Sequence, residues 1–83
     1  MAIVLPFPNV QQRLALRHAY WLARMHEPKR VVHGERVLGQ LIARLRSYGM
    51  AEDLVQREVD IYRRALASYL RQLLLQKRNG GAA

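Results

Sequence analysis

The sequence predicts an all-α fold: a three-helix bundle with a long C-terminal helix and an extended apolar arm at the N-terminus. Hydrophobic residues make up 51% of the 83 residues, and only three prolines and five glycines interrupt them. Apolar side chains recur at steps of three and four residues, as on one face of a helix, and helix start and stop signals bound three such segments. We expect residues 1–83 to form a single domain, because this length supports one small core.

Residues 1–8 are expected to form the extended arm. Pro6 and Pro8 each push the residue before them toward the extended region of backbone conformation. The arm has no helix of its own in which to bury its apolar side chains, which are Ile3, Val4, Leu5 and Phe7.

The first helix should begin after Asn9. Asn9 and Gln12 have the residue types and the spacing of a capping box. The helix should continue to about Met25 or His26, and Pro28 then ends it or starts the next helix. Its inward face is expected to consist of Leu14, His18, Trp21 and Met25.

The second and third helices form the main predicted pair. The second should span about 31–48, with Gly49 in the position of a helix-ending glycine. The third should span about 51–77, with acidic residues in its first turn and basic residues in its last, followed by a flexible tail at 79–83. Each of these two helices has an apolar seam with coiled-coil spacing. The seam of the second consists of Gly34, Leu38, Leu41, Leu45 and Tyr48, and that of the third consists of Val55, Val59, Tyr62, Leu66, Tyr69 and Leu73.

The short turn at Gly49 and Met50 predicts that these two helices are antiparallel. Leu41 and Leu45 should then contact the middle of the third helix, at Val59, Tyr62 or Leu66. The first helix should complete the bundle by lying in the groove between them.

His18 lies in the middle of the apolar arc of the first helix. A partly buried imidazole needs a hydrogen-bond partner, and Glu58, inside the apolar arc of the third helix, is the expected one. A structural His18–Glu58 pair is favoured over a catalytic dyad.

Two sequence motifs resemble a known group of proteins. The chain opens with Val4-Leu5-Pro6-Phe7-Pro8 ahead of an arginine-rich first helix, and it later carries Gly49-x5-Val55-x2-Glu58-Val59. In this it is similar to short alphaproteobacterial proteins of unknown function that open with the same pentapeptide. The resemblance covers approximately residues 3–75; it implies a bacterial origin and no activity.

The charge balance is strongly basic. Fourteen Lys+Arg against six Asp+Glu give a formal net charge of +8, which favours nucleic acid, acidic protein surfaces or anionic lipid as partners. A GC-rich genome also produces an arginine bias without any function. The possible phosphate-binding residues form one stripe on each of two helices, Arg13, Arg17 and Arg24 on the first and Arg57, Arg64 and Arg71 on the third. The alternative is that both stripes are solvated outer faces of the bundle.

The sequence offers no catalytic machinery, and we expect no enzyme. It contains no cysteine, so thiol nucleophiles and thiolate zinc sites are excluded. It has no glycine-rich phosphate loop and no paired-carboxylate signature. The three histidines lack the spacing of metal ligands, so we expect no metal, no cofactor and no small-molecule substrate.

The protein is expected to be cytoplasmic. Its apolar opening residues lack a basic region and are broken by prolines before a signal-peptide core forms. No later apolar run approaches the ~20 residues of a membrane span.

Apolar residues in excess of the bundle seam indicate a partner. Leu74 and Leu75 cannot both lie on the seam of the third helix, and the arm residues have no assigned place. We therefore expect these side chains to bind another protein, including a second copy of the chain. The leading functional hypothesis is a non-enzymatic regulatory or adaptor protein. The alternative is a basic nucleic-acid-binding accessory protein that contacts phosphates through the arginine stripes.

Overall fold

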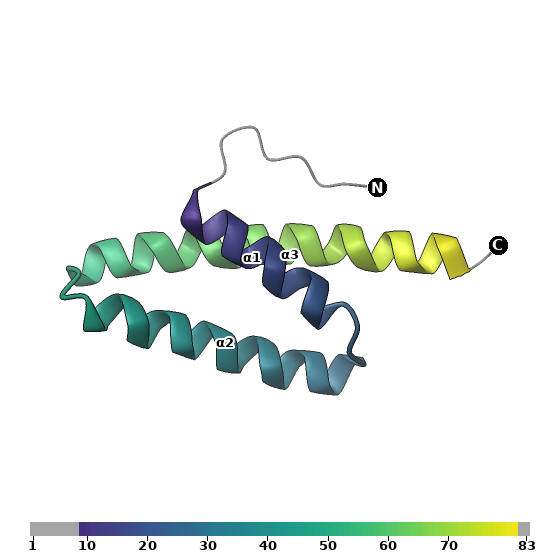
Figure 1. Cartoon of the computed structure of the whole chain (residues 1–83), viewed down its shortest axis with the longest axis horizontal. Coiled ribbons are helices and arrows are strands. Elements are labelled where there is room, and N and C mark those ends of the chain that lie inside the picture. Colours follow the sequence, from purple (N-terminus) through teal and green to yellow (C-terminus); the bar gives the residue numbers. More distant parts are fainter. Residues whose placement is uncertain (1–8, 82–83) are drawn as a thin grey trace.

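The computed structural model describes residues 9–81, which form three helices, α1 (Val10–Leu22), α2 (Glu27–Ser47) and α3 (Glu52–Gly81) (Figure 1). Within these residues there is no strand, and the predicted all-α, three-helix class is confirmed. As predicted, α2 and α3 run antiparallel (Figure 1). The first helix was expected in the groove between them; it crosses them obliquely and packs mainly on α3. The expected arm at 1–8 lies outside the described residues.

The start of α1 is fixed by the predicted capping box. The Gln12 backbone N–H donates to Asn9 Oδ1 at 2.8 Å, and the Asn9 N–H donates to Gln12 Oε1 at 3.1 Å. The helix ends at Leu22, earlier than the expected Met25 or His26. The Arg30 side chain explains this end, because it donates to the carbonyl oxygens of Leu22 and Met25 at 3.2 and 2.6 Å and so replaces partners that a longer helix would supply.

The second helix starts before the expected residue 31. Glu27 is its first residue and Pro28 lies in its first turn, where the missing N–H costs no hydrogen bond. Of the two roles left open for Pro28, it takes that of a helix start. At the other end Gly49 has a φ of 76°, so the predicted helix-ending glycine is confirmed.

The third helix is longer than the sequence predicted. It has 30 residues, which corresponds to about 45 Å at 1.5 Å per residue. It continues past the expected end at residue 77, so residues 79–81, assigned to a tail from the sequence, are helical. Glycine costs roughly 1 kcal/mol relative to alanine inside a helix, but it does not forbid the conformation.

The core lies mainly between α1 and α3, which make the most extensive contact of the three helix pairs. Ala15 and Ala19 of α1 are completely buried there. The expected inward face of α1, with Leu14, His18, Trp21 and Met25, was therefore misplaced by about one residue. Small side chains allow the backbone of α1 to approach α3 closely, so the larger ones flank the contact. The buried residues of α1 are Gln11, Ala15, Ala19 and Leu22.

The α2–α3 seam is confirmed in the half nearest the connecting turn. Leu41 and Leu45 belong to the same buried cluster as Val59 and Tyr62. Leu66 and Leu73 are only partly buried against that cluster. Tyr48, expected at the end of the seam, is 70% exposed, because α2 has ended at Ser47 and the chain already turns toward Gly49.

None of the described helices is long and apolar enough to cross a membrane.

Candidate functional site

A hydrogen-bonded pair of side chains joins α1 to α3. His18 Nδ1 lies 2.6 Å from the hydroxyl of Tyr62, and the two rings meet edge to face with centroids 5.7 Å apart. Tyr62 is completely buried and His18 is half-buried. The expected partner, Glu58, is half-buried and makes no hydrogen bond or ion pair with a described residue. His18 is thus bonded to Tyr62 and not to the expected Glu58. Tyr62 lies one helical turn further along α3 and is completely buried, whereas Glu58 is half-buried.

Burial determines the protonation of both partners. It lowers the pKa of His18, and the positive charges of Arg17 and Arg44 lower it further. Burial also raises the pKa of Tyr62 to about 12. At neutral pH the pair therefore consists of a neutral imidazole and a protonated phenol.

The Tyr62 hydroxyl is the hydrogen-bond donor in this pair. Tyr62 is fully buried, and His18 is the one described side chain to which its hydroxyl is bonded. An O–H that donates to Nδ1 is satisfied, whereas an Nδ1–H that donates to the phenol leaves the buried O–H without an acceptor. We therefore assign the imidazole proton to Nε2.

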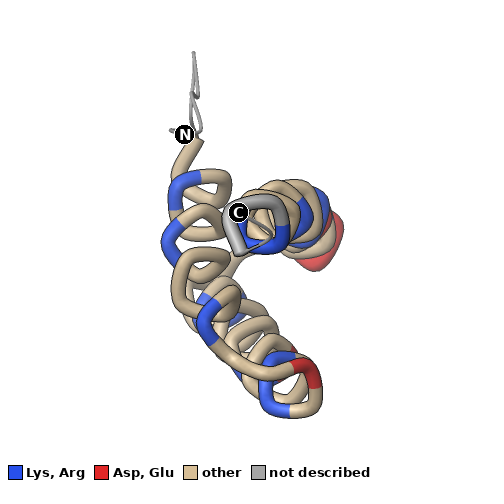
Figure 2. The backbone as a smooth tube through the Cα atoms, turned by 90° about the vertical axis from the view of Figure 1, so that its right-hand side faces the viewer, with Lys and Arg blue, Asp and Glu red and all other residues tan. Residues whose placement is uncertain are grey.

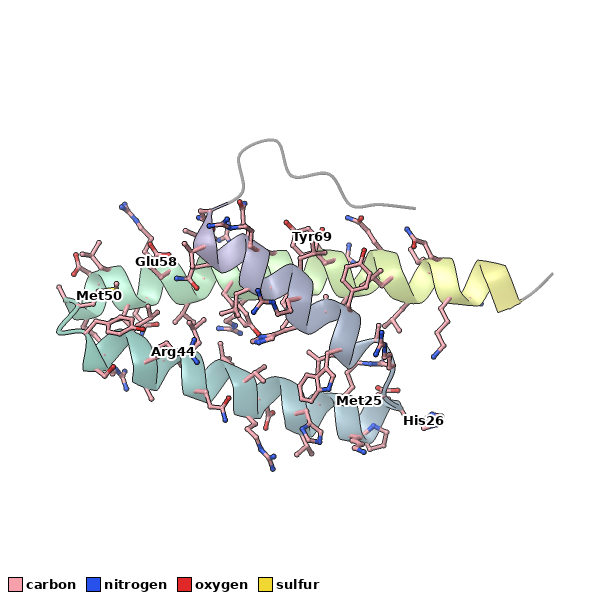
Figure 3. The ribbon with its side chains drawn as sticks, viewed as in Figure 1. Met25, His26, Arg44, Met50, Glu58 and Tyr69 are labelled. Atoms are coloured by element: carbon pink, nitrogen blue, oxygen red, sulfur yellow. The ribbon has the colours of Figure 1, made fainter. Side chains whose placement is uncertain are left out.

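A small pocket opens between α1 and α2 beside His18. Its volume is about 50 Å³. Arg44 lies on the C-terminal half of α2, opposite the stretch of α3 that carries Glu58 (Figure 3). No described carboxylate forms a salt bridge with Arg44. The pocket is lined by Leu14, His18, Val37, Gln40, Leu41 and Arg44.

The two arginine stripes lie on opposite sides of the α1–α3 pair. At about 100° per residue, each stripe is roughly 160–200° from the buried side chains of its own helix. Basic residues accordingly appear on the outer side of α1 and on the far side of α3 in Figure 2. Arg64 also forms an ion pair with Asp60 at 3.0 Å. All six predicted phosphate-binding residues are exposed, namely Arg13, Arg17, Arg24, Arg57, Arg64 and Arg71.

The predicted partner-binding leucines differ in their exposure. Leu75 is 49% exposed, and Leu74 is half-buried. The other predicted partner-binding residues, Ile3, Val4, Leu5 and Phe7, lie outside the described residues.

A second apolar surface surrounds the connection between α1 and α2. Trp21, at the end of α1, is 42% exposed and packs edge to face on His33. Val31 and Val32 of α2 are both more than half exposed. This surface was not predicted, because the apolar spacing of the first helix placed Trp21 on its inward face.

The pocket residues Gln40 and Arg44 were also missed by the sequence analysis. They are spaced i, i+4 on α2 and flank the seam residues Leu41 and Val37, so the pattern alone indicates only a polar border of the apolar face. Across the described residues, His, Asp and Glu side chains form no group able to hold a metal ion.

Comparison with known proteins gives one match. A family model described as a family of unknown function (DUF6074) matches residues 1–81. No curated protein and no solved structure matches the chain significantly. The similarity to short proteins of unknown function is thus supported, while the alphaproteobacterial origin and the shared opening pentapeptide stay predictions.

Proposed function

The chain belongs to this family of unknown function, and we propose that it is a small non-enzymatic regulatory or adaptor protein that acts through protein–protein contacts. Its first partner in this proposal is a second copy of the same chain. The bacterial origin, the cytoplasmic location and the organisation of residues 1–83 as one domain belong to the same proposal.

The observation that carries this proposal is the exposed apolar end of α3. Its C-terminal turns extend past the ends of α1 and α2 (Figure 1). Leu75 is about half exposed there, and Leu70, Leu73 and Leu74 are only partly covered. Burying apolar area is worth roughly 25 cal/mol per Å², and a helix end of this kind can pair with its own copy across a two-fold axis. The apolar arm residues are predicted to add to the same interface.

Self-association can be tested with two variants of matched chemistry. The double variant Leu74→Gln, Leu75→Gln removes the proposed contact. Leu54→Gln changes a residue of the same type at the opposite end of α3, where Leu54 is 45% exposed. Sedimentation velocity at micromolar concentration should give about twice the monomer mass for the wild type and for Leu54→Gln, and the monomer mass for the double variant. A monomeric wild type at these concentrations would contradict the proposal.

The alternative function is binding of nucleic acid through phosphates. The observation that favours it is the exposure of all six stripe arginines, of which only Arg64 is paired with a described carboxylate. Because the two stripes face in opposite directions, a straight duplex can contact only one of them at a time.

The salt dependence of binding distinguishes the two functions. If phosphates are contacted, the affinity for a labelled duplex should fall steeply between about 50 and about 200 mM salt, with a log–log slope of about −0.9 per contact. If α1 carries the site, replacing Arg13, Arg17 and Arg24 with glutamine should make the slope shallower, by an amount that corresponds to about three phosphate contacts. Absence of binding at the lower salt concentration would reject this alternative.

A further inference from the structure

We propose that the pocket between α1 and α2 binds a small tetrahedral oxyanion, of the phosphate or sulfate class, through His18, Gln40 and Arg44. This site differs from both arginine stripes and does not depend on self-association.

The size of the pocket fits such a ligand. A cavity needs about 10–15 Å³ to hold one water, so a pocket of about 50 Å³ has room for a few water-sized groups. A tetrahedral oxyanion presents four oxygen atoms of that size. Leu14, Val37 and Leu41 supply apolar walls, while Gln40 and Arg44 are exposed, so the pocket is open to an ion from solvent.

The polar lining consists of hydrogen-bond donors. With Nδ1 of His18 accepting from Tyr62, the Nε2–H is free to donate. The Gln40 amide and the Arg44 guanidinium add further N–H groups, and a guanidinium can hold an oxyanion through two parallel hydrogen bonds. None of the lining residues is acidic.

Charged or titratable groups from all three helices lie near His18. Arg17 on α1 and Arg44 on α2 place positive charge near the ring. Tyr62 on α3 contributes its neutral hydroxyl, and Glu58, one turn before Tyr62, forms no salt bridge with Arg44. An anion in the pocket would offset the two arginine charges and stabilise a protonated imidazole. Anion binding and protonation of His18 should therefore reinforce each other.

The test is a pH titration of the histidine ring signals by NMR in sodium sulfate and in sodium chloride of equal ionic strength. Sulfate keeps its charge over the pH range in which histidines titrate, so any change of protonation occurs on the protein. We expect the pKa of His18 to be higher in sulfate than in chloride. His26 and His33 do not line the pocket, so at any given pH their ring signals should be the same in the two salts.

Two arginine variants of α2 make the test specific. Arg44→Gln should weaken sulfate binding about tenfold, the usual effect of losing a charge-assisted hydrogen bond, and should reduce the sulfate effect on His18 accordingly. Arg36→Gln removes the same charge from an exposed position outside the pocket and should retain the effect. Equal shifts of all three histidines, or equal behaviour of the two variants, would overturn the proposal.

A second set of titrations identifies the source of the anion. Inorganic phosphate and a nucleoside monophosphate are added separately near neutral pH, and the Gln40 side-chain amide signals are followed. Equal affinities indicate a free ion as the ligand, and tighter binding of the mononucleotide indicates the phosphate group of a larger molecule. If neither compound moves these signals, the proposal is wrong.

Discussion

At the scale of single residues, the His18–Tyr62 pair is the most specific feature of this protein. It places a hydroxyl and an imidazole where α1 crosses α3, within a largely apolar contact. A buried polar pair of this kind disfavours other rotations of α1, because any rotation leaves one partner unsatisfied.

Protonation of His18 should destabilise the fold. The pKa of His18 is lower in the folded protein than its ordinary value of 6.5, so the unfolded chain binds this proton more readily. The contribution of His18 to stability is therefore complete above pH 6.5 and is lost as the pH falls through its folded pKa. Thermal melting between about pH 7 and pH 5 should show a larger decrease for the wild type than for His18→Gln.

An exposed histidine provides the control for that measurement. His26 is the N-cap of α2 and is exposed, and His26→Gln leaves the His18–Tyr62 pair intact, so this variant should retain the loss of stability at low pH that is attributed to His18. If His18→Gln also follows the wild type, the histidine does not control the pH dependence of folding.

Removing the Tyr62 hydroxyl should cost stability. Tyr62→Phe leaves the ring packed but takes the hydrogen bond from His18 Nδ1, and we expect a loss of about 1 kcal/mol in the free energy of unfolding. Tyr48→Phe makes the same chemical change at a residue that is 70% exposed and should have no measurable effect. Urea unfolding of both variants and the wild type checks this. A Tyr62→Phe variant as stable as the wild type would contradict the assigned role of the hydroxyl.

At the scale of elements, the close contact of α1 with α3 determines how the helices are arranged. Ala15 and Ala19 are spaced i, i+4 and form the centre of this contact. Because both are small, the interface has little tolerance for added volume. The longer α2 is buried mainly near its C-terminal half, at Leu41 and Leu45.

Enlarging the centre of the α1–α3 contact should therefore be harmful. Ala19→Leu forces extra methylene groups into a fully buried position, and we expect a loss of roughly 1–3 kcal/mol. Ala43→Leu adds the same volume at an exposed position of α2 and should leave the stability within about 0.5 kcal/mol of the wild type. Chemical unfolding compares the two, and a stable Ala19→Leu variant would mean that α1 packs more loosely than described.

At the scale of the whole molecule, the core is small and spread along the long helix α3. A chain of this size has a total stability of roughly 4–12 kcal/mol at 0.05–0.15 kcal/mol per residue. Three large side chains, Leu22, Val55 and Tyr62, are almost completely inaccessible to solvent. Each buried leucine is therefore a large part of the total, and association with a second copy would add to it.

Truncation of a central leucine should threaten the entire fold. Leu41 is 4% exposed, and we expect Leu41→Ala to cost roughly 2–5 kcal/mol. Leu66 is only partly buried, so Leu66→Ala should cost less than Leu41→Ala. Thermal unfolding ranks the two variants, and the reverse order would show that the middle of α3 is more deeply buried than described.

The local signals in the sequence were sufficient to predict the class of fold and several element boundaries. The capping box at Asn9 and the glycine that ends α2 act through backbone geometry within a few residues. Pro28 was compatible with the end of α1 or the start of α2, and the start of α2 at Glu27 was not predicted. The apolar spacing of α2 and α3 predicted that they pack against each other, and the short turn at Gly49 and Met50 predicted that they run antiparallel.

Only the tertiary structure decided which face of α1 is buried, which residue is bonded to His18, and whether the two arginine stripes share a side. The largest apolar side chains of α1 predicted one buried face, whereas the fold buries Ala15 and Ala19, whose small side chains allow α1 and α3 to pack closely. That rotation carries Trp21 to the surface and brings His18 to Tyr62. It also leaves Gln40 and Arg44 beside the imidazole, a grouping of α1 and α2 residues that no spacing along the chain predicts.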